Sequence, residues 1–212
     1  MTRGHFDRLR VGPGWRCWEV GAGGRSIPEA LAAAVGLTGY VLATDINPVW
    51  LDPRGTYEVR RHDIVADPPP GMFDLVHARL VLVHVPDRAA ALATMVAALR
   101  PGGWLLVEDA DTELQPLVCL EESGPAQRRT NRELMTRCGA DLRYGRTLPR
   151  TLRAAGLVDV AAAGDLPVGG TVCDRLETAT LRHVRAELVA SRLTDDAEID
   201  ACGRVSATTA PG

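Results

Sequence analysis

The chain has 212 residues, of which 46% are hydrophobic and 24% charged, as expected of a globular protein rather than a disordered one. A formal net charge of −3 gives no reason to expect nucleic acid as a partner. We expect no membrane span, because no apolar run approaches the roughly 20 residues that cross a bilayer. The five cysteines form no C-x-x-C pair and show no metal-ligand spacing. Together with the absence of a signal-peptide pattern, this predicts a reduced, cytoplasmic protein without a metal site.

Residues 1–109 predict an alternation of helices and buried strands. A short amphipathic helix is expected over 5–11, and further helices over 27–35 and 88–100, capped by Ser26 and Asp87. Pro101-Gly102-Gly103 is expected to terminate the last of these helices. Five strands are expected at 15–20, 40–44, 57–61, 73–77 and 104–107. Short loops between alternating elements predict an α/β fold with a doubly wound, mostly parallel sheet.

Residues 110–212 follow a different pattern, and no repeat or second core is evident. Helices are expected over 121–138, 148–155, 175–193 and 195–201, and a sixth strand over 157–163. The segment 203–212 is small and polar, so it would make a weak last strand or a disordered tail. A poorly covered sheet edge would favour a homodimer.

The glycine-rich stretch from Trp18 to Gly24 lies where the first strand turns into a helix. Glycines there let the backbone approach a ligand closely, and the helix N-terminus presents free N–H groups. Glu19, Asp45 and Asp63 stand at the ends of the first three strands. Asp45 lies 21 residues after Gly24, which matches the acid that binds ribose hydroxyls in dinucleotide folds. We therefore expect a ribose in this crevice.

The carboxylate of Glu19 separates two classes of ligand. A dinucleotide would bring its pyrophosphate beside this acid, and like charges 4 Å apart cost about 1 kcal/mol even in water. A ligand with an ammonium group would be attracted instead. Ser26 also stands where G-x-G-x-x-G requires glycine, and without lysine the common Tyr-x-x-x-Lys pair is impossible. An NAD(P)-dependent oxidoreductase is therefore the less favoured alternative.

Five short motifs resemble those of the class I S-adenosylmethionine-dependent methyltransferases in order and spacing. They are E-V-G-A-G-G at 19–24, A-T-D at 43–45, H-D-I at 62–64, F-D-L-V-H at 73–77 and L-R-P-G-G at 99–103. The resemblance implies a Rossmann-like fold and one methyltransferase domain over 1–212. Within it, 1–14 would form an N-terminal helix or lid, 15–109 the cofactor-binding core and 110–212 a helical substrate-side region.

The resemblance also implies which residues bind S-adenosylmethionine. Its methionine part would be contacted by the Glu19 carboxylate, near the ammonium, and by the glycine loop Gly21, Ala22 and Gly23. Ala78 and Arg79 would border the methionine carboxylate and the donor methyl group. Its adenosine part would be bound by Asp45 at both ribose hydroxyls, by Ile46 against adenine, and by Asp63 and Ile64 at the adenine edge. The sequence departs from the family at Arg25, which stands where a third alternate glycine is common.

The catalytic chemistry is less strongly indicated. His84 follows the strand nearest the donor methyl group, which makes it the candidate general base. His77, beside the same apolar run, is more typical of a hydrogen-bonded structural residue. No Asn-Pro-Pro-Tyr tetrapeptide follows the fourth strand, so we expect a small-molecule methyl acceptor, such as a secondary metabolite. The alternative is a non-catalytic partner subunit derived from the same fold, which Arg25 and the weak last strand favour.

Overall fold

A computed structural model of the chain describes residues 2–111, 132–133, 135–137, 139–164, 185–190, 192 and 195–197. The chain divides into two compact units, Met1–Ala110 with Tyr144–Val160, and Asp111–Arg143 with Ala161–Gly212. The first unit contains the sheet and the candidate site. In the second, the helix α8 (Arg185–Ala190) buries Leu188 completely. The single-domain organisation over 1–212 stays a prediction.

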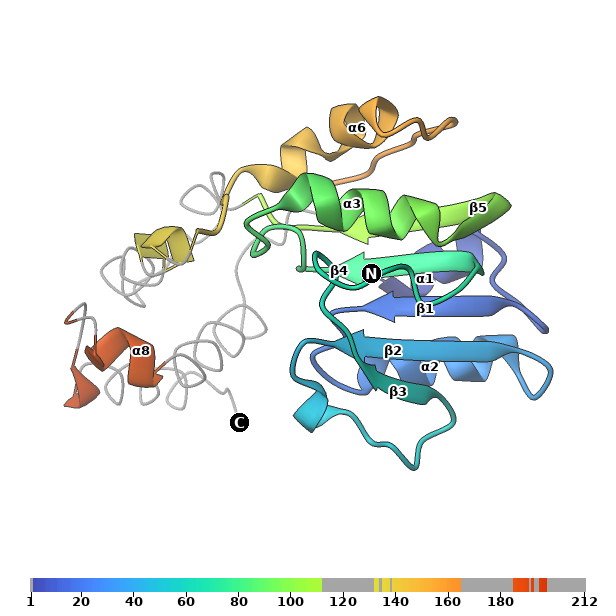
Figure 1. The fold of residues 1–212 in the computed structure, drawn as a ribbon, viewed down its shortest axis with the longest axis horizontal. Helices are drawn as coiled ribbons and strands as arrows, with labels where there is room; N and C mark the ends of the chain where they lie inside the picture. The colour runs from blue at the N-terminus through green and yellow to red at the C-terminus, as the bar shows by residue number, and fades with distance from the viewer. Residues whose placement is uncertain are drawn as a thin grey trace, which may run out of the picture. The chain divides into compact units, whose positions relative to one another are not determined.

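The first unit is built on one parallel sheet of five strands. They are β1 (Arg16–Val20), β2 (Tyr40–Asp45), β3 (Glu58–Arg61), β4 (Phe73–Arg79) and β5 (Leu99–Glu108). Their order is β3-β2-β1-β4-β5, and every neighbouring pair is parallel (Figure 1). The order reverses between β1 and β4, which opens a crevice at the carboxyl ends of these strands. The predicted doubly wound fold class is confirmed.

Side-chain alternation along the strands sends two cores to opposite faces of the sheet. Cys17 of β1 packs with the helices α1 (Thr2–Arg8) and α2 (Ser26–Val35). Its neighbour Trp18 packs with α3 (Arg88–Ala97) and α6 (Tyr144–Ala154) on the other face. Figure 1 shows α2 behind the sheet and α3 in front of it. The crevice therefore lies at one end of a sheet whose two faces are both covered by helices.

The two predicted helix caps have different outcomes. Asp87 caps α3 as predicted, because its side chain accepts a hydrogen bond from the Ala90 N–H. The prediction for Ser26 was wrong. Arg25 has helical backbone angles and its carbonyl accepts from the Glu29 N–H, so Ser26 is already the first residue of α2. No side chain caps this helix.

The region around Pro101-Gly102-Gly103 also differs from the prediction, which had it end a helix at Arg100. α3 ends at Ala97, and β5 begins at Leu99. Strand pairing jumps from Leu99 opposite Phe73 to Trp104 opposite Leu75, so the glycines form an irregularity within the strand. A Cβ on Gly103 would lie 3.0 Å from the Phe73 carbonyl oxygen, which explains why the close approach needs glycine.

Most other predicted elements of the described region are confirmed within a few residues. The first helix lies at Thr2–Arg8 rather than 5–11, and α6 starts at Tyr144 rather than 148. After β2 the chain also forms a short 3-10 helix, η1 (Pro48–Trp50). The sixth strand predicted over 157–163 was wrong: Val158 is 83% exposed, and the segment has no sheet partner among the described residues. The helices predicted over 121–138, 175–193 and 195–201 fall mostly outside the described residues, and the segment 203–212 entirely so.

None of the helices in the described part of the chain is both long and apolar enough to cross a bilayer.

Candidate active site

The glycine loop after β1, Gly21 to Gly23, forms a cradle of partly exposed backbone, and two of its positions require glycine. Gly21 and Gly23 both have φ of +58°, a left-handed conformation that favours glycine. A Cβ on Gly21 would lie 2.6 Å from Cγ2 of Val81, in the loop that follows β4. The Ala22 N–H donates to the Thr44 carbonyl at 2.9 Å, which fixes the loop across the end of β2. The backbone is thus held where a ligand can approach it closely.

Asp45 joins this loop at the end of β2. Its Oδ2 accepts from the Gly23 N–H at 3.0 Å, and its Oδ1 accepts from the Asn47 N–H at 2.8 Å. Because each carboxylate oxygen can accept two hydrogen bonds, one lone pair on each oxygen is left for a ligand hydroxyl. The structure therefore brings together Asp45 and the predicted loop Gly21, Ala22 and Gly23, in an arrangement that fits a ribose-bearing cofactor.

Arg25, the departure from the family pattern, is directed away from the cradle. Its Nε lies 3.8 Å from Oε1 of Glu29, one turn further along α2, and its side chain is 67% exposed. An exposed pair of this kind contributes little to stability. Its position leaves the glycine loop uncrowded.

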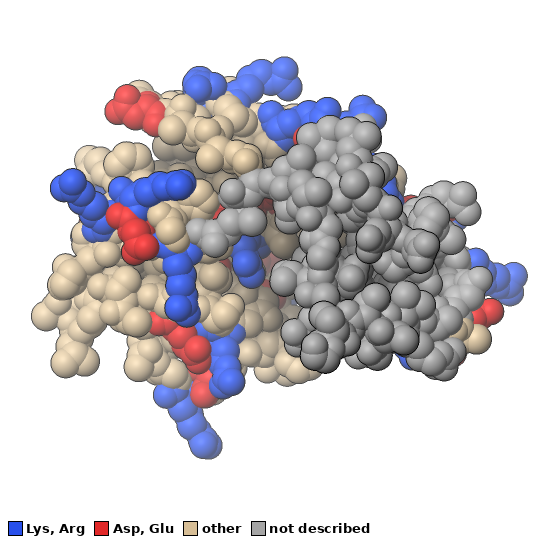
Figure 2. All heavy atoms as spheres, turned by 180° about the vertical axis from the view of Figure 1, so that it is seen from behind, with Lys and Arg blue, Asp and Glu red and all other residues tan. Residues whose placement is uncertain are grey.

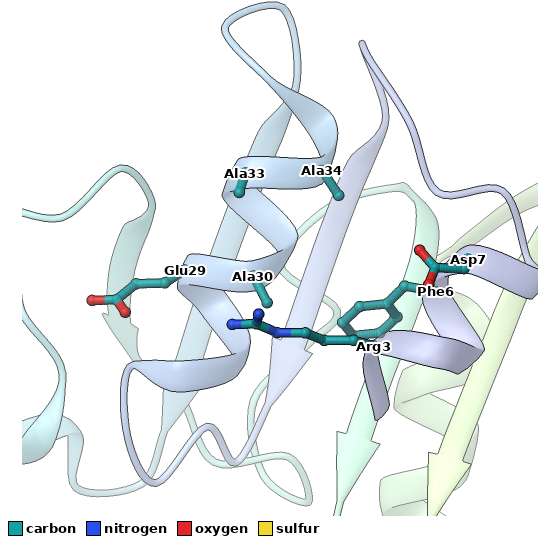
Figure 3. A pocket seen from close by; sticks show the side chains of 7 residues that line it. All are labelled: Arg3, Phe6, Asp7, Glu29, Ala30, Ala33 and Ala34. Atoms are coloured by element: carbon teal, nitrogen blue, oxygen red, sulfur yellow. The ribbon is translucent and has the colours of Figure 1, made fainter. Parts of the chain in front are cut away.

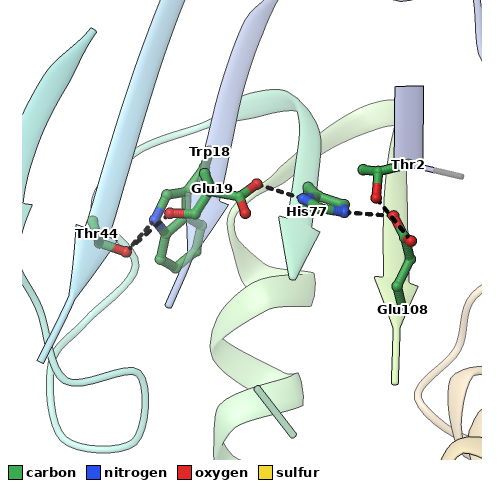
Figure 4. Close-up of polar contacts among 6 residues, drawn as sticks. All are labelled: Thr2, Trp18, Glu19, Thr44, His77 and Glu108. Carbon is green, nitrogen blue, oxygen red and sulfur yellow. Dashed lines mark hydrogen bonds and ion pairs between the residues drawn. The ribbon is translucent and has the colours of Figure 1, made fainter. Parts of the chain in front are cut away.

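Glu19 is buried at the end of β1, and only 2% of its surface is exposed. Its carboxylate is hydrogen-bonded to Nδ1 of His77 on the adjacent strand β4. Its carbonyl oxygen accepts from the Thr44 hydroxyl, which in turn accepts from Nε1 of Trp18 at 2.9 Å (Figure 4). Burial raises the pKa of the Glu19 carboxyl, although the His77 imidazole opposes that shift.

Around Asp63 the chain turns tightly after β3. Oδ1 of Asp63 accepts from the N–H groups of Val65 and Ala66, and the Asp63 N–H donates to Asp67. The Ile64 side chain packs in the core beside Trp18, so only its backbone can face a ligand. Ile46, by contrast, is 59% exposed at the end of β2. Among the described residues, no hydrogen bond links Asp63 to the glycine loop or to Asp45.

The end of β4 brings a cation close to Glu19. Ala78 is buried, whereas Arg79 is exposed and lowers the pKa of the nearby Glu19 carboxyl. Arg79 forms no ion pair within the described residues. Leu80 follows with a left-handed φ of +56° and an exposed side chain, and its N–H donates to the Glu108 carbonyl. Non-glycine residues in this conformation are strained and concentrate at functional sites.

His84 lies beyond this strand end, exposed on the loop before α3. Partial burial and the neighbouring Arg88 lower the pKa of its imidazole. The ring is therefore neutral at pH 7 and able to accept a proton.

His77, predicted as a hydrogen-bonded structural residue, is buried and has a carboxylate partner at each ring nitrogen, whereas Glu108 and Asp109 were not predicted as site residues. Oδ2 of Asp109 accepts from the Val83 N–H at 3.1 Å, while its Oδ1 is buried without a partner among the described residues. Burial raises the pKa of Asp109 to about 6. Position is the signal that could have found them, since His77 lies near the end of β4, which pairs with β1, and Glu108 and Asp109 lie at the end of β5, which pairs with β4. No group of three metal-ligating side chains occurs in the described ranges.

A separate hollow of about 220 Å³ lies between α1 and α2 (Figure 3). It is lined by Arg3, Phe6, Asp7, Glu29, Ala30, Ala33 and Ala34. None of the predicted site residues borders it. We therefore place the candidate site at the strand ends and not in this hollow.

Comparisons with known proteins agree with this placement. Residues 8–162 match the family described as "Methyltransferase domain". Methyltransferase str3 of Strobilurus tenacellus is 36% identical over 107 residues, which are 49% of this chain and 35% of that protein. A ubiquinone biosynthesis O-methyltransferase of Paracidovorax citrulli is 30% identical over 113 residues, 50% of this chain and 48% of that protein. The chain thus spans between a third and a half of the length of these relatives.

Solved structures share the fold. A "putative methyltransferase" from Bacillus halodurans C-125 aligns with a TM-score of 0.54 and 18% identity over 73% of this chain and 68% of that one. A "putative sarcosine dimethylglycine methyltransferase" from Galdieria sulphuraria aligns with a TM-score of 0.59 and 13% identity, over 97% and 76%. Identities this low show the fold alone. The family match covers well over half of the sequence and agrees with the sheet order and the glycine cradle, so the chain belongs to the class I S-adenosylmethionine-dependent methyltransferase family.

Proposed function

We propose that this protein transfers a methyl group from S-adenosylmethionine to a small molecule, such as a secondary metabolite, and releases S-adenosylhomocysteine. The observation that carries the proposal is the glycine cradle bonded to Asp45, with the buried Glu19 at the neighbouring strand end. A similar protein carries the name ubiquinone biosynthesis O-methyltransferase, which also supports a small acceptor.

The donor's two halves would bind to different strand ends. Its ammonium would lie near the Glu19 carboxylate, and its carboxylate near the Arg79 guanidinium, since opposite charges favour both contacts. The Gly21–Gly23 backbone and Ala78 would line the methionine chain between them. Asp45 would accept from the ribose hydroxyls, and Ile46, Asp63 and the Ile64 N–H would contact adenine.

The protein's own contribution to catalysis would be alignment and the exclusion of water. The bound donor supplies an activated methyl group, and holding an acceptor in line with it can contribute roughly 7–11 kcal/mol through proximity alone. Where the acceptor must lose a proton, the neutral His84 imidazole would accept it. The buried Asp109 carboxyl would help to position the acceptor. The Val83 N–H already holds this carboxyl in one orientation by donating to its Oδ2.

Calorimetry with S-adenosylmethionine and with NAD tests the proposal directly. We expect binding of S-adenosylmethionine at micromolar concentration and no heat with NAD. The reverse result would favour the NAD(P)-dependent oxidoreductase. A folded protein that binds neither would favour the alternative of a non-catalytic partner subunit.

The proposal extends to partners and oligomeric state. Figure 2 shows arginine and acidic side chains interspersed on the described surface of one side, a pattern that fits a small acceptor better than nucleic acid. We also propose that the protein is cytoplasmic and that it forms a homodimer. Light scattering is expected to give twice the mass of the chain; a concentration-independent monomer would contradict the dimer and leave the methyl transfer unaffected.

A further inference from the structure

A row of three ionisable side chains crosses the sheet at its carboxyl end. Glu19 of β1 stands opposite His77 of β4, and Glu108 of β5 lies two positions beyond the residue opposite His77, so all three point to the same face. Nδ1 of His77 is hydrogen-bonded to Glu19, and Nε2 lies 3.1 Å from Oε1 of Glu108 (Figure 4). The imidazole thus has a carboxylate at each nitrogen.

The first helix covers this row from outside. The Thr2 hydroxyl donates to Oε2 of Glu108 at 3.0 Å, and the Phe6 ring meets the His77 ring edge-on at a centroid distance of 5.3 Å. The His77 side chain is fully buried as a result, and that of Glu108 is 18% exposed. The imidazole itself is therefore shielded from water.

The two bonds determine the charge of the row. A neutral imidazole can donate from only one nitrogen, whereas an ionised carboxylate only accepts, so two carboxylate partners require the doubly protonated ring. Burial opposes this charge, but Glu19 and Glu108 together raise the pKa of His77 to about 9. One imidazolium between two carboxylates leaves one negative charge in excess. A buried excess charge is unfavourable unless a further cation approaches it.

Only the Glu19 end of the row adjoins the glycine cradle. Val20 alone separates Glu19 from Gly21, and the other end is closed by Thr2. The exposed Arg79 already offsets part of the excess charge at Glu19. A cation bound at the cradle would offset it further, and the proposed function places the donor's ammonium there.

We propose that His77 is a positioning residue: held by Glu108, it keeps the Glu19 carboxylate ionised and oriented toward the ammonium of the methyl donor. The inference rests on the proposed function and adds a role for His77, Glu108 and the first helix. Without the imidazolium, the buried Glu19 carboxyl is expected to retain its proton, and a neutral carboxyl attracts no ammonium.

The test compares two ligands that differ in the amino-acid part, whose ammonium Glu19 would recognise. S-adenosylhomocysteine carries the amino acid, whereas 5′-methylthioadenosine has the same adenosine and a thioether but no ammonium. Calorimetry on H77Q is expected to show at least about tenfold weaker binding of S-adenosylhomocysteine, the scale of a hydrogen bond to a charged group. Binding of 5′-methylthioadenosine should remain within about twofold of the wild type, because its contacts do not involve Glu19.

Two further variants separate this role from a loss of folding. L75V shortens a buried side chain on the same strand and face, two residues before His77, so it perturbs the core without removing a polar group of the row. It should leave both affinities unchanged. E108Q can still accept from the imidazole but removes one carboxylate charge, and it should weaken S-adenosylhomocysteine selectively. This variant carries the test if H77Q does not fold.

The outcomes discriminate between the two proposals. Selective loss of S-adenosylhomocysteine in H77Q or E108Q supports the positioning role. Equal losses for both ligands, or none in a folded variant, would overturn it while the proposed function stands. If the wild type bound neither S-adenosylhomocysteine nor S-adenosylmethionine, the proposed function would fail, and the inference with it.

Discussion

At the scale of single residues, Asp45 serves the protein and its proposed ligand at once. Its two oxygens already hold the N–H groups of Gly23 and Asn47, so the carboxylate is oriented before any ligand arrives. Such preorganisation lowers the entropy that binding would otherwise lose. The same carboxylate therefore shapes the loop and would receive the ribose.

We expect Asp45→Ala to weaken S-adenosylmethionine binding by roughly 1.5–3 kcal/mol, the scale of hydrogen bonds to a charged group. Calorimetry measures this loss, and Asp45→Asn, which retains one acceptor oxygen, should lose less. An unchanged affinity in the alanine variant would mean that the ribose site lies elsewhere.

Gly21 is constrained in two ways, by its left-handed φ and by the Val81 side chain above it. Gly21→Ala is therefore expected to destabilise the fold by about 1–3 kcal/mol, measured by urea denaturation. Gly36→Ala, at φ of +63° in open space, should show the backbone penalty alone. Gly24→Ala, with open space and no left-handed φ, should be nearly neutral. A Gly21 variant as stable as the Gly24 variant would contradict this geometry.

At the scale of elements, the N-termini of α3 and α2, on opposite faces of the sheet, can be compared directly, because a side chain caps only the first. Asp87→Ala removes the side-chain acceptor of the Ala90 N–H and should lower the free energy of unfolding by about 1 kcal/mol. Ser26→Ala should change it little, because Ser26 is inside α2 and caps nothing. Denaturant unfolding of both variants gives the comparison. Equal losses would show that Ser26 does act as a cap.

The sequence predicts the elements best where apolar runs and turn residues agree. β1, β2 and α2 are bounded by glycines or by an acid at the strand tip, and their predicted limits are within one residue of those in the structure. The irregular pairing of β5 was missed because Pro101-Gly102-Gly103 is as typical of a helix end as of a bulge. The strand expected over 157–163 failed because an apolar run needs a neighbouring strand, which local sequence does not reveal.

In the candidate site, as in the strands and helices, local features could be predicted from the sequence and long-range contacts could not. The glycines and Asp45 follow from local spacing and come together in the structure. The partner of Glu19 did not follow, because His77 lies 58 residues away and is brought beside it only by the strand order. A residue's chemistry could be named from its sequence neighbours, but its buried partner required the pairing of the strands.

For the molecule as a whole, the buried row predicts how stability depends on pH. The folded state holds the His77 proton up to a pKa of about 9, whereas the unfolded state releases it near 6.5. The stabilisation is therefore fully present below pH 6.5 and is lost as the pH rises toward 9.

Urea denaturation between pH 6.5 and 9 should show the free energy of unfolding falling by on the order of 1–3 kcal/mol, at about 1.4 kcal/mol per pKa unit. The thiol of Cys17 contributes little below pH 9, because its unfolded pKa is 9.0 and burial raises it to about 12. In H77Q the slope should flatten. A wild-type protein with constant stability across this window would show that the row holds no extra proton.

The buried row also constrains the order in which the chain can fold. Its bonds join residues separated by 58, 31 and 106 positions, and the longest joins Thr2 to Glu108. Contacts this distant form late, because closing a long loop loses entropy before any contact offsets it. During synthesis, Thr2 must wait until Glu108 has left the ribosome and β5 has paired with β4. The hydrogen bond from Thr2 is thus among the last to form, although Phe6 of α1 can already pack against β1 and α2.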